Sequence, residues 1–238
     1  MVMYFILAVA SIGLALSPNH SAEAAGFTID TTPTWDGMLN VGPWSTRPSG
    51  TETIGQVIST PSSALADVLL DDFTFFAGGS DAIFNYKAHV YQWESTGELS
   101  SGATIGPSLF ESPILVLPGE RNFTPLRVNV GGILLAPSTT YALFVSTVGV
   151  GNVIPGETTL GVQSDAYLGG KWIYNNNPFT FIGPWNGGFV TPPGDLAFIA
   201  NFRANFREVP GPLPILGAGA AIGFSRKLRS RIKAAGMS

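Results

Sequence analysis

The sequence has no cysteine among its 238 residues. This absence excludes disulfide scaffolds, thiol catalysis and metal sites held by cysteine thiolates. Histidine is nearly absent too, with only His20 near the N-terminus and His89 further along. A histidine-based zinc site needs several such ligands, and a Ser-His-Asp triad would depend on His89 alone. The sequence also lacks a Gly-x-Ser-x-Gly elbow, a phosphate-binding P-loop and a dinucleotide-binding glycine fingerprint.

Charge is sparse as well, since 12% of the residues are charged, about half the share usual in globular proteins. Five of the 12 basic residues lie within the last 13 positions, which leaves the rest of the chain acidic. Nucleic-acid binding depends on Lys and Arg neutralising phosphates, so we expect no nucleic-acid partner. What the sequence does have is apolar material, at 45% of its residues, together with 29 Gly and 18 Pro. This composition is typical of a packed, turn-rich domain.

The N-terminal residues contain an apolar run, Tyr4–Leu16, followed by Ala22-Glu23-Ala24. A short apolar run before such an A-x-A site is typical of a secretory signal peptide, although no basic residue precedes it here. The run is too short to span a membrane, which takes about 20 residues. We predict a signal helix within residues 1–24 and a mature chain that begins at or near Ala25. A buried N-terminal helix is the alternative.

Residues 208–238 form a tail with three successive parts. The first is a proline-rich motif made of Val209, Pro210, Gly211, Pro212, Leu213 and Pro214. The second is an apolar segment, Leu213–Phe224, which predicts a short hydrophobic transmembrane helix. The third is a basic cluster made of Arg226, Lys227, Arg229, Arg231 and Lys233. Basic residues after an apolar segment are typical of a stop on the cytoplasmic side of a membrane. An amphipathic basic helix on the membrane surface is the alternative.

This tail closely resembles the PEP-CTERM sorting signal of exosortase substrates, in the VPGPLP form common in cyanobacteria. It departs from the literal motif because Pro210-Gly211-Pro212 stands in place of Pro-Glu-Pro. The resemblance implies an exported protein that is held transiently in the inner membrane and cleaved near the motif by an exosortase-like membrane protease. It further implies delivery to the cell surface or extracellular matrix. A periplasmic domain anchored at both ends, without sorting, is the alternative.

Residues 25–207 alternate apolar and polar residues with a period of two and show neither a helical period nor an internal repeat. In Leu196–Phe206 every second residue is apolar, which predicts a half-buried strand. The other strand candidates are Val68–Phe76, Phe84–Tyr91, Pro113–Leu117, Phe123–Val130 and Tyr141–Val148. Turn signals such as Gly131-Gly132 bound them, and strands joined by tight turns pair antiparallel. We predict an all-β, antiparallel, jelly-roll-like β-sandwich, with an immunoglobulin-like sandwich as the alternative.

The body also resembles, more loosely, the secreted β-sandwich cargo domains that often precede this sorting signal. The resemblance rests on Trp35-Asp36-Gly37, on residues 69–76 and 84–93, and on the closing residues 195–202. It implies no catalytic residues.

Gly169–Gly194 is the most unusual stretch, because it combines Asn, Gly, Pro and aromatic residues with a single charge. Aromatic rings stack on the apolar faces of sugars, and amides bond their hydroxyls. We predict a ligand-binding surface for polysaccharide made of Trp172, Tyr174, Asn175, Asn176, Asn177 and Trp185. An irregular hairpin whose rings pack into the sandwich edge is the alternative. The other three tryptophans, Trp35, Trp44 and Trp93, also lie near expected strand ends or loops.

Acidic residues are the remaining candidates for chemistry. A glycosidase needs two carboxylates about 5–9 Å apart. Asp71 and Asp72 are neighbours in an expected strand, so we expect them on opposite faces. Calcium stays open as a ligand because Asp67, Asp81, Glu94 and Glu98 lie near strand ends. We expect no catalytic residues, no resident metal and no other cofactor, and a structural or adhesive surface protein. A surface glycan hydrolase or lyase with paired carboxylates is the alternative function.

Overall fold

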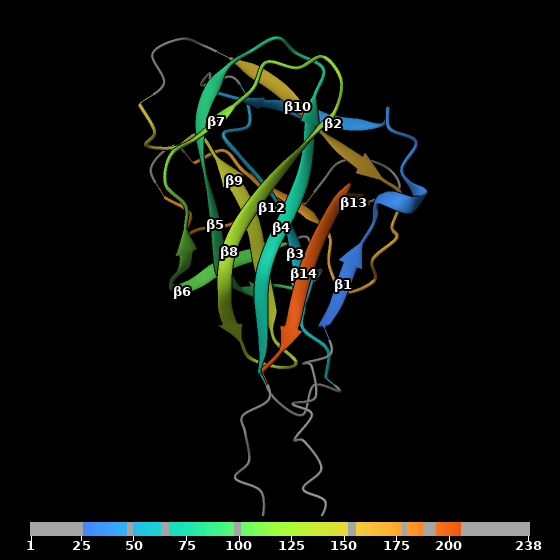
Figure 1. Cartoon of the computed structure of the whole chain (residues 1–238). Coiled ribbons are helices and arrows are strands. Elements are labelled where there is room, and N and C mark those ends of the chain that lie inside the picture. Colours follow the sequence, from blue (N-terminus) through green and yellow to red (C-terminus); the bar gives the residue numbers. More distant parts are fainter. Residues whose placement is uncertain are drawn as a thin grey trace, which may run out of the picture.

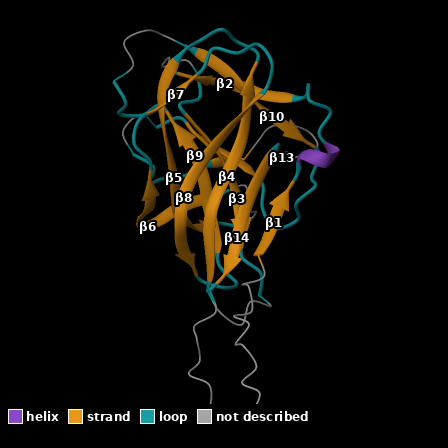
Figure 2. Cartoon of the chain, in the orientation of Figure 1, coloured by secondary structure: helices purple, strands orange, loops and turns teal. Residues whose placement is uncertain are grey.

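The computed structural model describes residues 26–46, 50–62, 67–97, 101–151, 156–177, 180–187 and 194–205. The expected signal helix, the sorting motif and the basic cluster lie outside these residues. Within them the chain forms two antiparallel sheets that pack face to face as a β-sandwich (Figure 1). The helical content of the described part is one 3-10 turn, η1 (Thr32–Thr34), marked in Figure 2. None of its helices is long and apolar enough to cross a membrane.

The first sheet has the strand order β1-β14-β4-β10-β13, with β8 paired to β4 and β2 paired to β10. Its strands are β1 (Gly26–Asp30), β2 (Asn40–Ser45), β4 (Val68–Gly78), β8 (Thr124–Leu135), β10 (Glu157–Gln163), β13 (Asp195–Leu196) and β14 (Phe198–Ala204). The long strands β4 and β8 pair along most of their length and form the centre of the view in Figure 1.

The second sheet has the order β12-β11-β3-β9-β5-β6, with β7 paired to β5. Its strands are β3 (Thr53–Ser59), β5 (Phe84–Ser95), β6 (Gly102–Glu111), β7 (Leu115–Leu117), β9 (Thr140–Ser146), β11 (Trp172–Asn175) and β12 (Asn186–Gly187). Strands that are consecutive in the chain usually lie in opposite sheets: β3, β5 and β9 belong to the second, whereas β4, β8 and β10 belong to the first. The chain therefore crosses the core repeatedly.

The core lies between the two sheets because each strand points every second side chain inward. In β4 the inward residues include Phe73 and Phe75, and in β9 they include Leu143 and Val145. Burial of each large apolar side chain stabilises the fold by about 1.5–3 kcal/mol. The alternation seen in the last strand is confirmed, since Phe198 and its inward neighbours in β14 lie in this core. The prediction of an all-β, antiparallel fold is also confirmed.

One expected turn is wrong. Gly131-Gly132 does not end a strand but lies inside β8, and the ladder with β4 resumes after a register shift. Both glycines have positive φ, at 78° and 83°, which residues with a Cβ rarely adopt. On β4 the shift leaves Asp71 as the residue without a partner in the ladder. The pair of glycines thus allows a β-bulge in a continuous strand.

Candidate functional site

The predicted ligand-binding stretch begins with β11, which lies between β3 and the short edge strand β12 in the second sheet. β11 pairs with β3 in a register that sets Trp172 opposite Gln56 and Tyr174 opposite Ile54. Trp172 lies in the main core and Tyr174 packs against that core. Ile173 belongs to a different cluster of buried residues. The strand period therefore places Trp172 and Tyr174 on the inner face of the sheet and separates them from Ile173.

A pocket of about 380 Å³ opens beside these two rings. Its lining residues are Val41, Gly42, Thr51, Ile54, Trp172, Tyr174 and Asn176. The rings of Trp172 and Tyr174 lie 5.9 Å apart between centroids with 33° between their planes. The structure thus brings together three of the six predicted residues, and none of the described residues in the lining carries a formal charge.

The three residues differ in what they offer the pocket. Trp172 is only 4% exposed, and its Nε1 has no hydrogen-bond partner among the described residues. Tyr174 is partly exposed, and burial raises the pKa of its hydroxyl. Asn176 is exposed. Tyr174 and Asn176 therefore supply the accessible surface, and Trp172 supplies its floor.

Asn175 and Asn177 do not line this pocket. Asn175 is buried, and its Oδ1 accepts a hydrogen bond of 2.7 Å from the backbone N–H of Asn177. Asn177 is exposed beside it. This contact joins a residue to the second one after it, which is the pattern of an Asx turn at the end of β11.

Trp185 lies elsewhere, which corrects the expectation that it faces a ligand with Trp172. It is only 2% exposed, and its Nε1 donates to the backbone carbonyl of Phe181 at 2.8 Å. Its ring meets those of Trp93 and Phe144 at centroid distances of 5.9 and 5.0 Å. Trp185 is therefore a packing residue.

Trp185 belongs to a second apolar cluster, which we call the outer cluster. Its buried members are Val57, Trp93, Ala142, Phe144, Ile173 and Trp185, with Tyr91 and Phe181 packed against them. Phe144 alternates in β9 with inward residues of the main core, so this cluster covers the outer face of the second sheet. The alternative prediction for this stretch, rings packed against the sandwich, holds for Phe181 and Trp185.

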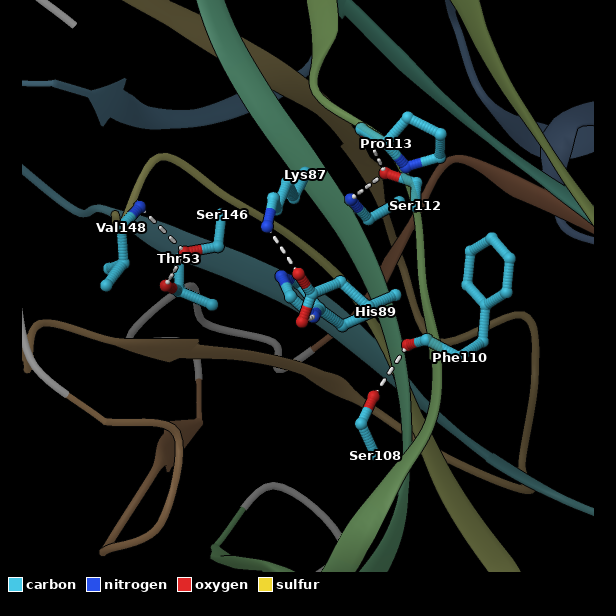
Figure 3. Close-up of polar contacts among 11 residues, drawn as sticks. Thr53, Lys87, His89, Ser108, Phe110, Ser112, Pro113, Ser146 and Val148 are labelled. Atoms are coloured by element: carbon cyan, nitrogen blue, oxygen red, sulfur yellow. Dashed lines mark hydrogen bonds and ion pairs between the residues drawn. The ribbon is translucent and has the colours of Figure 1, made fainter. Parts of the chain in front are cut away.

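His89 is buried and packs at the margin of the outer cluster. Figure 3 shows it beside Lys87 of the same strand. Its ring lies 5.0 Å from that of Phe144 and 4.6 Å from that of Phe181, measured between centroids. Neither ring nitrogen has a hydrogen-bond partner among the described residues. Glu111 forms an ion pair with Lys87 and brings a carboxylate oxygen to 3.9 Å from Nδ1. Burial nevertheless lowers the pKa of His89 to about 4.

Asp71 and Asp72 were expected on opposite faces of β4, but they lie on the same face. Asp71 binds Arg203 with contacts of 2.6–2.8 Å, and Asp72 binds Arg127 at 2.9 Å and Asn201 at 2.8 Å. Arg203 and Asn201 alternate in β14 with core residues, so both acids lie on the outer face of the first sheet. The bulge at Asp71 is the reason, since an extra residue resets the alternation.

Asp195 is the most deeply buried of the described acids. One carboxylate oxygen accepts a hydrogen bond of 2.8 Å from Gln56, and the other accepts from the backbone N–H groups of Ala166 and Tyr167. Burial raises the pKa of Asp195. Gln56 belongs to the second sheet and Asp195 to the first, so this carboxylate ties the two sheets together.

The acids considered for calcium are dispersed in the described part of the chain. Asp81 forms an ion pair with Arg121, at 2.6 Å. Glu98 lies outside the described residues. No group of three or more His, Cys, Asp or Glu side chains gathers within the described ranges.

Trp35 is the exception among the five tryptophans, because it alone is partly exposed while the other four are buried. In the sequence Trp35 stands in Trp35-Asp36-Gly37 and is one of the tryptophans near expected strand ends or loops, but it was not among the predicted ligand-binding residues. The usable signal was the Asp-Gly pair after it, which is typical of a tight surface turn.

Comparison with known proteins adds little to this description. No family model and no curated protein matches the chain. Among solved structures, the chain is similar to the cysteine protease and lectin-like domains of Cwp84, a surface layer associated protein of Clostridium difficile, with 13% identity and a TM-score of 0.43. The similarity covers 65% of this chain and 32%, about a third, of that one. A likeness this distant carries no argument about function.

Proposed function

We propose that this chain is an exported, non-enzymatic β-sandwich protein of the cell surface or extracellular matrix, and that it contacts surface polysaccharide at the pocket of Trp172, Tyr174 and Asn176. The observation that carries the contact is the pocket itself. It combines an aromatic pair and an exposed amide, and its described lining residues carry no formal charge. Ring faces pack on the apolar faces of sugars, and an amide both donates to and accepts from hydroxyls.

The size and the polar groups of the pocket support a sugar. A volume of about 380 Å³ is at the small end of the range for ligand pockets, roughly 300–1,000 Å³. The buried Nε1 of Trp172 lacks an acceptor among the described residues, which costs free energy. A sugar hydroxyl in the pocket is an acceptor of the kind this group lacks.

The strand order supports the jelly-roll form of the sandwich. In the first sheet β1, β14, β4 and β8 are neighbours in that order, and in the second β3, β9, β5 and β6 are. This arrangement is that of a jelly roll, in which eight antiparallel strands are divided between two packed sheets. Strands β10 to β13 form an insertion between β9 and β14, and this insertion supplies Trp172 and Tyr174.

The two ends of the sequence support export and sorting. Tyr4–Leu16 with Ala22-Glu23-Ala24 supports a cleaved signal peptide. The proline motif, apolar segment and basic cluster support transient residence in the inner membrane and cleavage by an exosortase-like membrane protease. No cofactor is part of this proposal.

Three observations on acids support a non-enzymatic role over a glycan hydrolase or lyase. Asp71 and Asp72 share a face, but each is engaged by an arginine. Asp195 has both oxygens occupied by hydrogen bonds within the fold. The pocket of Trp172 and Tyr174 has no acidic residue among its described lining residues.

The test is retention of the purified protein on polysaccharide extracted from the surface of its host. Tyr174→Ala and Asn176→Ala should each weaken retention, and loss of a central binding ring costs about 2 kcal/mol or more, roughly thirtyfold in affinity. Asn177→Ala is the matched control, because Asn177 is an exposed neighbour that does not line the pocket. The thermal midpoint of each variant shows whether it is folded. Equal retention of wild type and both pocket variants would contradict the proposed contact.

A further inference from the structure

A second pocket, of about 490 Å³, lies where the connection between η1 and β2 meets the connection between β7 and β8. Its lining residues are Trp35, Gly37, Met38, Arg121, Asn122 and Phe123. It shares no residue with the pocket of Trp172 and Tyr174. Met38 is 74% exposed, so this surface holds an apolar side chain in water beside two aromatic rings.

The indole of Trp35 is fixed in place as a platform. Its Nε1 donates to the backbone carbonyl of Leu39 at 2.9 Å, so its polar atom is already satisfied. Its ring meets Phe123 nearly edge-on, with centroids 5.0 Å apart and 82° between the planes, and lies 5.5 Å from the ring of Phe76. The ring also rests on Gly161 of β10, where a Cβ would lie 2.5 Å from an indole carbon. A ring held on several sides loses little conformational freedom when a ligand binds.

The turn after Trp35 sets the rim of this pocket. The carboxylate of Asp36 accepts hydrogen bonds of 2.8 Å from the backbone N–H groups of Met38 and Leu39. Gly37 has a φ of 74°, a conformation that suits glycine. Asp36 and Gly37 thus position Met38 without using the side chains that line the pocket.

The opposite rim is polar. The guanidinium of Arg121 is 81% exposed and is held by Asp81, which it contacts at 2.6–3.0 Å. Arg121 thus presents guanidinium N–H donors at this rim, and Asp81 largely balances its charge. Asn122 is exposed, and its side chain makes no hydrogen bond within the described part of the chain. Its amide is free to bond a ligand through both a donor and an acceptor.

We propose that this second pocket is a binding site for a neutral hexopyranose unit of a saccharide chain, stacked on Trp35 and Phe123 and hydrogen-bonded by Asn122 and Arg121. The apolar face of a pyranose ring matches an aromatic platform. Its neighbouring hydroxyls both donate and accept, so the Asn122 amide bonds them in both directions and Arg121 donates to them. An apolar peptide fits this lining less well, because one rim of the pocket consists of Arg121 and Asn122.

Binding at this site does not depend on binding at the pocket of Trp172 and Tyr174. One consequence rests on the proposed function: if both pockets bind, one chain contacts a polysaccharide at two places. Two weak contacts on one molecule then raise its overall avidity well above either affinity.

The experiment follows the indole N–H signals of the five tryptophans by NMR during titration with cellohexaose or laminarihexaose, two neutral oligosaccharides. The signal of Trp35, assigned with Trp35→Phe, should shift on addition of at least one of them at millimolar concentration. Asn122→Ala should weaken that binding several-fold. Trp35→Ala lacks the reporting signal, so its binding is measured by isothermal titration calorimetry, which should show none. Asn122→Ala also protects the test from a folding defect in Trp35→Ala, because Asn122 is exposed.

Asn176→Ala is the matched control, because it removes an exposed amide from the other pocket. It should leave the response of Trp35 unchanged, so failure of one site is distinguishable from failure of the other. The proposal is overturned if neither oligosaccharide shifts the signal of Trp35, or if binding persists unchanged in Trp35→Ala and Asn122→Ala. A response to an apolar peptide but to neither sugar would likewise overturn it.

Discussion

At the scale of single residues, the side chains packed around a residue decide whether it affects stability or can contact a ligand. Little in the sequence marks His89 or Trp35 as a functional residue. His89 is 2% exposed and sits between phenylalanine rings, whereas Trp35 is partly exposed on the other sheet. The first is a buried base that the fold keeps neutral, and the second is a ring available to a ligand.

His89 makes the stability of the fold depend on pH. Its pKa is lowered to about 4 in the folded protein, against about 6.5 in the unfolded chain. As the pH falls below about 6.5, the unfolded chain binds a proton at this position and the folded protein does not. The stability contributed by neutral His89 is therefore complete above that pH and is lost progressively down to about pH 4, by about 3 kcal/mol.

His89→Phe keeps a ring between Phe144 and Phe181 and removes the titration. Urea unfolding from pH 7 to pH 4 should show wild type losing about 3 kcal/mol more than the variant. Glu111 and Lys87, the charged groups nearest to His89, are present in both proteins and serve as the internal control. Stability curves that run parallel over this range would show that His89 does not titrate as described.

At the scale of elements, Gly169–Gly194 is the segment whose structure is hardest to predict from its own sequence. It was expected as one ligand-facing surface, but its ends have different surroundings. β11 places Trp172 against the main core, and the residues before β12 place Trp185 against the outer cluster. The segment therefore both completes an edge of the second sheet and covers part of its outer face.

Trp185→Ala tests this covering role. Truncation of a buried tryptophan should lower the free energy of unfolding by about 3–5 kcal/mol, because it leaves a cavity beside Trp93 and Phe144. Ile182→Ala is the control in the same segment, since Ile182 is an exposed apolar residue, and it should leave stability within about 0.5 kcal/mol of wild type. Chemical denaturation monitored by circular dichroism gives both values. A Trp185→Ala protein as stable as Ile182→Ala would mean that the outer cluster is not tightly packed.

At the scale of the whole molecule, the fold of the sandwich and the proposed export and sorting depend on different parts of the chain. The sandwich is held by one core between its sheets and by the contact of Gln56 with Asp195 across them. The proposed export and sorting depend instead on the leader and the tail, which lie outside the described residues.

Mass spectrometry of the protein isolated from its host tests both processing events together. The mature chain should begin at or near Ala25 and end near the proline motif, because Ala22 and Ala24 suit signal cleavage and the tail resembles a sorting signal. Replacement of all five basic residues of the cluster with neutral ones should impair tail processing, because the stop on the cytoplasmic side weakens. Retention of Met1 would contradict the proposed cleavage of a signal peptide. Unchanged processing in the neutral variant would show that the basic cluster is incidental.

The sequence alone determined the fold class and the positions of β4, β5, β7, β8, β9 and β14, but strands such as β3, β6 and β10 were not predicted. Alternation with a period of two is a local property, so it is visible in Leu196–Phe206 without any knowledge of the partner strands. The tertiary structure decided the rest, because the remaining features depend on pairing between distant residues. The bulge that brings Asp71 and Asp72 to one face needs the register between β4 and β8.

The candidate sites divide in the same way. An excess of rings and amides in the sequence was sufficient to find Trp172, Tyr174 and Asn176, which line one pocket. Burial of Trp185 and exposure of Trp35 were decided by which segments cover each sheet, and coverage is set by packing between parts of the chain far apart in sequence. The sequence by itself thus determined which residue types were at hand and how each strand alternates, and only the tertiary structure decided which rings face solvent.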